Sequence, residues 1–119
     1  MAKRINSVVK GKVGEREAMG FLIHAWRLPL GTFKRNPYEQ AAGRATGDIV
    51  GLPGVHIEVK RVARPRLSTW LTQLYRDCPE GSIPVLVYRV DNDRDWQMHI
   101  RAGDLLSLHE RIAEFRSAA

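Results

Sequence analysis

The chain has 119 residues, of which 44% are hydrophobic and 27% are charged. That length suits one compact domain, and those fractions are ordinary for a globular protein with a single core. No apolar run approaches the roughly 20 residues of a membrane-spanning helix, and no apolar stretch follows the basic N-terminus, so neither a span nor a signal peptide is expected. The single cysteine, Cys78, excludes an intrachain disulfide and a Cys-x-x-Cys metal site, which favours a cytoplasmic location.

The charge balance points to a polyanionic partner. Lys and Arg number 19 against 13 Asp and Glu, which gives a net charge of +6. A basic surface raises the local concentration of polyanions and speeds their encounter. Nucleic acid is therefore the expected partner, with an affinity that falls as salt rises.

The hydrophobic pattern predicts helices and strands in the order αβββαββα, an α/β (α+β) fold with a mixed central sheet flanked by helices. Residues 1–12 are expected to form a basic N-terminal arm, and residues 13–119 a single domain. Residues 34–46, rich in Arg, Gly and Asn, are expected to form a long loop. The predicted helices and strands are helix 13–26, strands 28–33, 47–51 and 55–60, helix 67–78, strands 83–88 and 96–101, and helix 104–115.

Three segments carry specific expectations about burial. Helix 13–26 is expected to bury Ala18, Phe21, Leu22 and Ala25, with Met19 and Trp26 beside them. Strand 96–101 alternates and is expected to bury Trp96, Met98 and Ile100. The last helix is expected to bury Leu105, Leu108, Ile112 and Phe115.

The chemical signal is Asp48 followed by the Glu58-Val59-Lys60 tripeptide. Side chains alternate along a strand, so Glu58 and Lys60 point to the face opposite Val59, about 7 Å apart. If residues 52–54 form the hairpin loop, Asp48 lies directly opposite Glu58 on that face. Two carboxylates then converge beside a lysine.

Paired carboxylates repel each other unless a cation joins them. Hard oxygen ligands suit Mg²⁺, which keeps several waters and accepts phosphate oxygens as further ligands. Such a metal polarises a phosphoryl group and activates water, and Lys60 is suited to orient that water or offset transition-state charge. The competing interpretation is a surface Asp-Glu-Lys cluster of solvated ion pairs, because Glu-x-Lys triplets are common.

Helix 13–26 offers one further carboxylate. At about 100° per residue, Glu15 lies roughly 40° from the centre of the apolar arc and Glu17 roughly 120° away. An ionisable group aimed at the sheet needs a partner. Glu15 is therefore the candidate active-site carboxylate and Glu17 a solvated one, while a salt bridge from Glu15 to Lys60 or an arginine is the alternative.

Four motifs in this order resemble those of the PD-(D/E)XK nuclease superfamily, in particular archaeal-type Holliday junction resolvases and related small phage endonucleases. The resemblance covers about residues 10–101. The motifs are Lys10-Gly11 with Gly14-Glu15-Arg16-Glu17, Gly47-Asp48-Ile49-Val50, Ile57-Glu58-Val59-Lys60 and Ile83-Pro84-Val85-Leu86-Val87.

The resemblance implies a restriction-endonuclease-like core that cleaves DNA phosphodiesters with Mg²⁺ or Mn²⁺. It makes Asp48 and Glu58 metal ligands with the Val59 carbonyl, Lys60 the catalytic lysine, and Glu15 the helix glutamate that helps hold or hydrate the metal. Gln73 falls where some members place a polar active-site residue. A homodimer is implied, and the cytoplasm would be the host's if the chain is phage-encoded.

The sequence departs from the family in two places. Gly47 stands where the family's nominal proline precedes the aspartate, a change common in resolvase-like members. The loop 34–46 is longer than in archaeal resolvases, which leaves the DNA shape open. A general or sequence-specific duplex nuclease and a non-catalytic DNA-binding subunit are the alternatives, and the intact Asp48, Glu58 and Lys60 set disfavours the latter.

Basic residues near the motif are candidates for phosphate contacts. A solvated basic connector is the alternative for those that follow Lys60. His56 shares the face of Glu58, where a lone histidine is more often a surface or packing residue than a catalytic one. The candidate DNA-binding residues are Lys34, Arg35, Arg44, Arg61 and Arg64.

Overall fold

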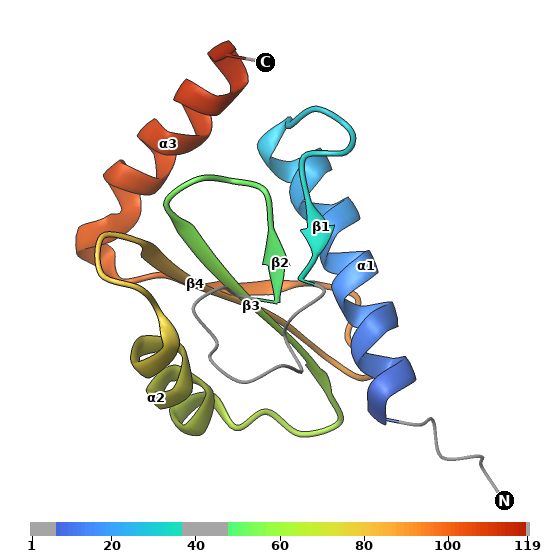
Figure 1. Cartoon of the computed structure of the whole chain (residues 1–119). Coiled ribbons are helices and arrows are strands. Elements are labelled where there is room, and N and C mark those ends of the chain that lie inside the picture. Colours follow the sequence, from blue (N-terminus) through green and yellow to red (C-terminus); the bar gives the residue numbers. More distant parts are fainter. Residues whose placement is uncertain (1–6, 37–47, 119) are drawn as a thin grey trace, which may run out of the picture.

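The computed structural model describes the backbone of residues 7–36 and 48–118 and the side chains of residues 12–36 and 48–118. This part of the chain is an α+β fold in the predicted order, with a short 3₁₀ helix added before the last helix (Figure 1). The elements are α1 (Ser7–Trp26), β1 (Lys34–Arg35), β2 (Ile49–Val50), β3 (Val55–Val62), α2 (Leu67–Asp77), β4 (Ile83–Val90), β5 (Gln97–His99), η1 (Ala102–Asp104) and α3 (Leu105–Ala118).

The five strands form one mixed sheet in the spatial order β1-β2-β3-β4-β5. Strand β3 pairs antiparallel with β2 and parallel with β4, while β1 and β5 add antiparallel edges. The long parallel pair is apolar on both faces of β4, as expected for a strand covered on both sides. The mixed sheet predicted from the alternating pattern is confirmed.

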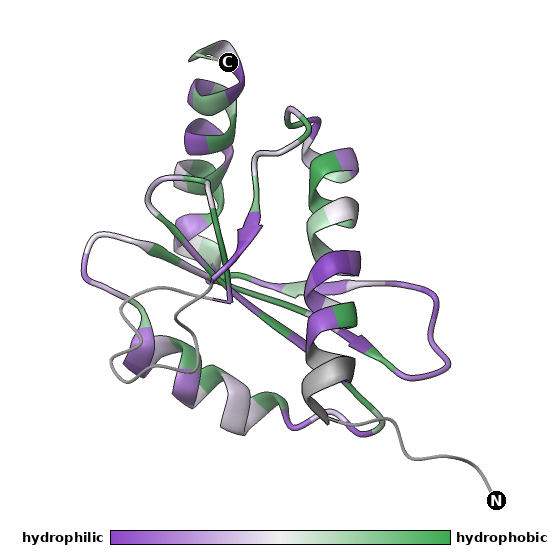
Figure 2. Ribbon diagram, turned by 45° about the vertical axis from the view of Figure 1, so that its right-hand side comes forward, coloured by the Kyte–Doolittle hydropathy of each residue, from purple (hydrophilic) through white to green (hydrophobic). Residues whose placement is uncertain are grey.

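The two faces of the sheet carry separate cores. One core joins α1 and α3 to β3 and β4 through residues that include Ala18, Leu22, Leu108, Ile57 and Val85. The other joins α2 to β4 through Trp70, Leu74 and Leu86. Helices α1 and α2 therefore lie on opposite sides of the strands (Figure 1), and hydrophobic residues recur along the central strands (Figure 2).

The N-terminal third differs from the sequence prediction in two places. Helix α1 begins at Ser7, so residues 7–12 are helical and not part of an arm, and residues 1–6 lie outside the described residues. The predicted strand 28–33 is a turn, and the strand is Lys34–Arg35, at the start of the predicted loop. The turn follows because Arg27 ends α1 in the left-handed region at φ 53°, just before Pro29.

Several residues expected in the core are exposed. Phe21 is 36% exposed, although it stacks on Trp96 at a centroid distance of 6.5 Å, and Ala25 is exposed as well. Met98 and Leu105 are 37% and 59% exposed because β5 is a short edge strand and only the Leu108 side of α3 meets the sheet. The helices and strands have the predicted periodicity, but fewer of their hydrophobic residues are buried than the pattern predicts.

Two glycines allow the close packing that builds the hairpin and its helix. A Cβ at Gly51 would clash with the Thr32 carbonyl oxygen, and its φ of 139° disfavours a side chain, so glycine lets the chain before β1 cross the end of β2. A Cβ at Gly14 would lie 3.1 Å from the Cβ of Arg61, which shows how closely α1 approaches β3. That approach carries Glu15, the next residue, to the sheet.

Within the described residues, none of the helices is both long and apolar enough to pass through a bilayer.

Candidate metal centre

The hairpin of β2 and β3 places Asp48 opposite Glu58. The recorded pair is Ile49 with Ile57, and one step further along this antiparallel register Asp48 faces Glu58. This is the register predicted from a three-residue loop at 52–54. The alternation also holds, since Ile57 and Val59 join the core beneath α1 while Glu58 shares the α2 face with its neighbour Leu86 on β4.

Backbone hydrogen bonds fix Asp48 on three sides. Its N–H donates to the Ile57 carbonyl at 2.9 Å, and its carbonyl accepts from the Asn36 N–H at 2.9 Å. Its Oδ2 accepts from the Val59 N–H at 2.7 Å. The side chain is thereby held against the strand that carries Glu58.

The Asp48 carboxyl group has a strongly perturbed pKa. Its pKa is raised from 3.8 to about 8, chiefly by burial and next by the negative charge of Glu58. The Val59 N–H opposes it, whereas a hydrogen bond with the Glu58 side chain and the charge of Glu15 act in the same direction as burial. Both Glu58 and Glu15 therefore act electrostatically on Asp48.

Glu58 is buried and has a histidine partner. It is 7% exposed, and its Oε1 lies 3.0 Å from Nε2 of His56, which is 3% exposed. The two residues are neighbours on the same face of β3. His56 is thus a buried residue and not a surface one, and its contact with Glu58 was not predicted from the sequence because the histidine was considered alone.

Glu15 is buried and ion-paired. It is 6% exposed, as its place in the apolar arc predicted, and its Oε2 accepts from Nε of Arg35 at 2.5 Å. The sequence left open a salt bridge from Glu15 to an arginine, and Arg35 is its partner. Arg35, which was predicted to bind DNA, pairs with Glu15 in this structure.

Glu17 was expected to be a solvated residue, and that expectation is wrong. Its Oε1 accepts from Nη1 of Arg61 at 2.7 Å, and its Oε2 accepts from Nη1 of Arg89 at 2.8 Å. Arg61 also lies 3.9 Å from Asp91. The carboxylate at the edge of the apolar arc thus ties α1 to β3 and β4, and Arg61 is occupied within the protein.

The remaining candidates differ in burial, and one of them lies outside the described residues. Lys60 is partly buried on β3, one alternation beyond Glu58 on the same face. Gln73 is partly buried on α2, the helix that covers this face. Lys34 and Arg64 are exposed, whereas Arg44 falls in the segment that the structure does not describe.

The donor set fits a hard divalent cation. Over the described residues, no group of three or more His, Cys, Asp and Glu side chains could hold a metal ion. The expected set has only two such side chains, Asp48 and Glu58, with the Val59 carbonyl as a third oxygen. The raised pKa of Asp48 supports the fit, because a cation between the two carboxyl groups would relieve their repulsion.

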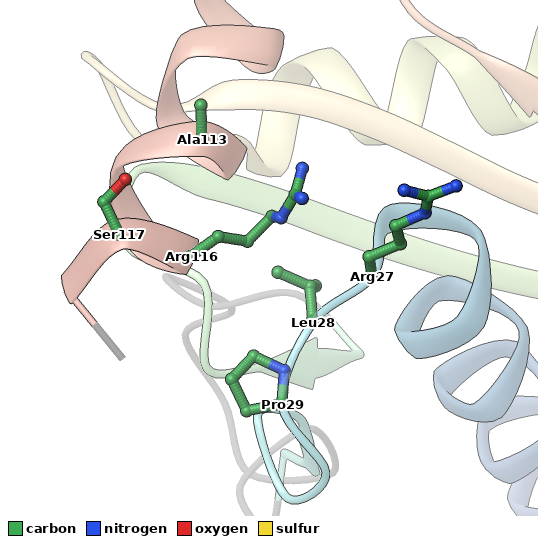
Figure 3. Close-up of a pocket in the computed structure, with 6 residues that line it drawn as sticks. All are labelled: Arg27, Leu28, Pro29, Ala113, Arg116 and Ser117. Carbon is green, nitrogen blue, oxygen red and sulfur yellow. The ribbon is translucent and has the colours of Figure 1, made fainter.

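A large cavity, of about 680 Å³, lies elsewhere. It is lined by Arg27, Leu28, Pro29, Ala113, Arg116 and Ser117, between the turn after α1 and the end of α3 (Figure 3). None of the candidate site residues lines it. Its two arginines lie at the C-terminal ends of α1 and α3, where positive charge offsets the helix dipole. This role accounts for both arginines, so we assign no ligand to the cavity.

No protein-family model, curated protein or solved structure matches this chain. The functional interpretation therefore depends on the residues and geometry of the site.

Proposed function

We propose that the chain is a metal-dependent DNA endonuclease that hydrolyses phosphodiester bonds, and that it prefers branched DNA. The observation that carries the proposal is the convergence of Asp48 and Glu58, with the pKa of Asp48 raised to about 8 by burial and by Glu58. Two buried carboxyl groups side by side destabilise the folded state, and such strongly perturbed groups cluster at functional sites. The resemblance to PD-(D/E)XK nucleases supplies the reaction class.

Asp48, Glu58 and the Val59 carbonyl would hold Mg²⁺ or Mn²⁺. Such an ion supplies a Lewis acid for the phosphoryl oxygens and a water of lowered pKa. Asp48 and Glu58 would fix its place, because the hairpin register sets the two residues opposite each other and the Val59 N–H holds the Asp48 carboxyl group. The Lys60 ammonium group, on the same face, is placed to offset the negative charge of the transition state.

Glu15 approaches from α1 and acts on Asp48 through its charge. Arg35 partly neutralises Glu15. A cation at Asp48 would compete with Arg35 for this carboxylate. We propose that Glu15 helps hold or hydrate the metal and that Arg35 then turns to the DNA backbone.

The proposed partner is DNA, bound through its phosphates by Lys34, Arg44 and Arg64. The net charge of +6 supports this partner. We also propose a homodimer, since symmetric cleavage of a junction needs two sites, and exposed Met98 and Leu105 beside the edge strand β5 offer apolar surface for one. A cytoplasmic location is part of the same proposal.

One assay tests the proposal. The full chain is incubated with a four-way junction, a flap, a linear duplex and a single strand of matched sequence, with Mg²⁺, Mn²⁺ or EDTA. We expect metal-dependent cutting that favours the branched substrates. Equal cutting of linear duplex would replace junction selectivity with a general duplex nuclease, and binding without cutting of any substrate would leave a DNA-binding subunit.

A further inference from the structure

The histidine beside Glu58 has a geometry that packing alone does not require. His56 and Glu58 are two residues apart on β3, so they share the α2 face. The Nε2 atom of His56 lies 3.0 Å from Oε1 of Glu58, and both side chains are at least nine-tenths buried. A buried imidazole and a buried carboxylate are each costly without a partner, so the contact is strongly favoured over either group alone.

The direction of the hydrogen bond follows from the chemistry of the two groups. A carboxylate oxygen only accepts, so the His56 tautomer that carries its proton on Nε2 donates to Oε1 of Glu58. One oxygen of Glu58 is thereby committed to His56, which fixes the plane of the carboxyl group.

We propose that His56 is a positioning residue that holds Glu58 in the orientation in which it binds a divalent cation. This inference rests on the proposed function, because it assigns His56 to the same metal centre. Hydrogen bonds from neighbours orient carboxylate ligands, and loss of such a neighbour typically weakens metal affinity or activity about 10- to 100-fold. His56 acts through Glu58 and does not touch the cation or the DNA.

The test compares three variants of the full chain, with Mn²⁺ alone as the probe. His56→Leu removes the donor, and His56→Gln keeps an N–H donor at a similar reach from the backbone. His24→Leu is the matched control, because His24 is exposed on α1. Calorimetry gives the Kd for Mn²⁺, thermal unfolding gives the stability of each variant, and DNA binding without metal gives the Kd for a four-way junction.

We expect His56→Leu to raise the Kd for Mn²⁺ roughly 10- to 100-fold while the Kd for DNA stays within about twofold. His56→Gln should recover most of the Mn²⁺ affinity, and His24→Leu should match the wild type. If the role of His56 were purely structural, His56→Leu would lower the melting temperature and leave the Kd for Mn²⁺ unchanged in the folded protein. That result, or a His56→Gln variant as weak as His56→Leu, overturns the inference.

A measurement on the wild type covers the case in which His56→Leu does not fold. With ¹⁵N-labelled histidine, addition of Mg²⁺ should shift the Nε2 resonance of His56 and leave that of His24 in place. A His56 resonance unmoved by saturating Mg²⁺ overturns the inference. If Mn²⁺ binding requires Glu58 but no DNA is cleaved, the nuclease proposal is overturned and the inference about His56 holds. If the wild type does not bind Mn²⁺, both are overturned.

Discussion

The Val59 N–H donates a hydrogen bond of 2.7 Å to Oδ2 of Asp48, so a side chain from the start of β2 is fastened to the backbone of β3. Val59 lies between Glu58 and Lys60 in the tripeptide. The bond therefore sets the distance of Asp48 from both functional side chains at once. It also favours the ionised form of Asp48, in opposition to burial and to Glu58.

The pH dependence of stability should reveal Asp48. Its pKa is about 8 in the folded chain against 3.8 for the ordinary group, so between these values the folded state binds the extra proton. Its contribution to stability is fully present below about pH 4 and is lost as pH rises through about 8. In EDTA the melting temperature of the wild type should fall relative to that of Asp48→Asn over this range.

The Asp48→Asn variant keeps the size of the side chain and the acceptor for the Val59 N–H but carries no charge. Parallel melting curves against pH for the two proteins would contradict the raised pKa. Saturating Mg²⁺ should stabilise the wild type at pH 8 and leave Asp48→Asn unchanged, because ligand that binds only the folded state adds stability by mass action.

Glu58→Gln should abolish cutting and leave DNA binding intact. The amide removes the negative charge that the cation needs but keeps an oxygen to accept from His56. Loss of several kcal/mol of transition-state stabilisation corresponds to a decrease of more than about 100-fold in rate. Single-turnover cleavage and junction binding measure the two effects separately, and retained activity would place the site elsewhere.

Glu15 and Glu17 form a matched pair on one helix with opposite expected roles. Glu15→Gln should weaken Mn²⁺ binding and cleavage, because Glu15 is buried and its charge acts on Asp48. Glu17→Gln should lower the free energy of unfolding by about 1 kcal/mol, since it weakens the bridges to Arg61 and Arg89, with cleavage unchanged. Equal loss of cleavage in both variants would argue against a specific role for Glu15.

Arg61 and Arg64 should also separate. Arg61 is paired with Glu17 inside the protein, whereas Arg64 is exposed on the connector after β3. Arg64→Ala should weaken DNA binding and reduce the slope of log K against log salt by about 1, with the melting temperature unchanged. Arg61→Ala should lower the melting temperature and leave DNA binding and its salt slope unchanged. A lower salt slope for Arg61→Ala would show that the Glu17 bridge opens when DNA binds.

The parts of the fold that the sequence predicted well are those set by short-range geometry. The turn residues 52–54 and the alternation on both sides determine the β2–β3 register, so the opposition of Asp48 and Glu58 was predictable. The helical wheel likewise predicted that Glu15 is buried. These inferences need only the period of a strand or helix.

The parts that the sequence did not predict depend on long-range partners. The Glu15–Arg35 and Glu17–Arg89 pairs join residues 20 and 72 positions apart, and no local pattern indicates which arginine meets which carboxylate. Arg35 and Arg61 were assigned to DNA because they are basic and near the motif. The exposure of Leu105 depends on the angle at which α3 meets the sheet, which periodicity does not give.

The hydrogen bond from the Asn36 N–H to the Asp48 carbonyl joins the two residues that flank the segment 37–47. The pairing of β1 with β2 reinforces that junction, so the residues before and after the segment are held together. We therefore expect that a change in the length or composition of residues 37–47 leaves this junction in place. Under the proposed function, the choice of substrate could then vary in evolution or by engineering separately from the cleavage chemistry.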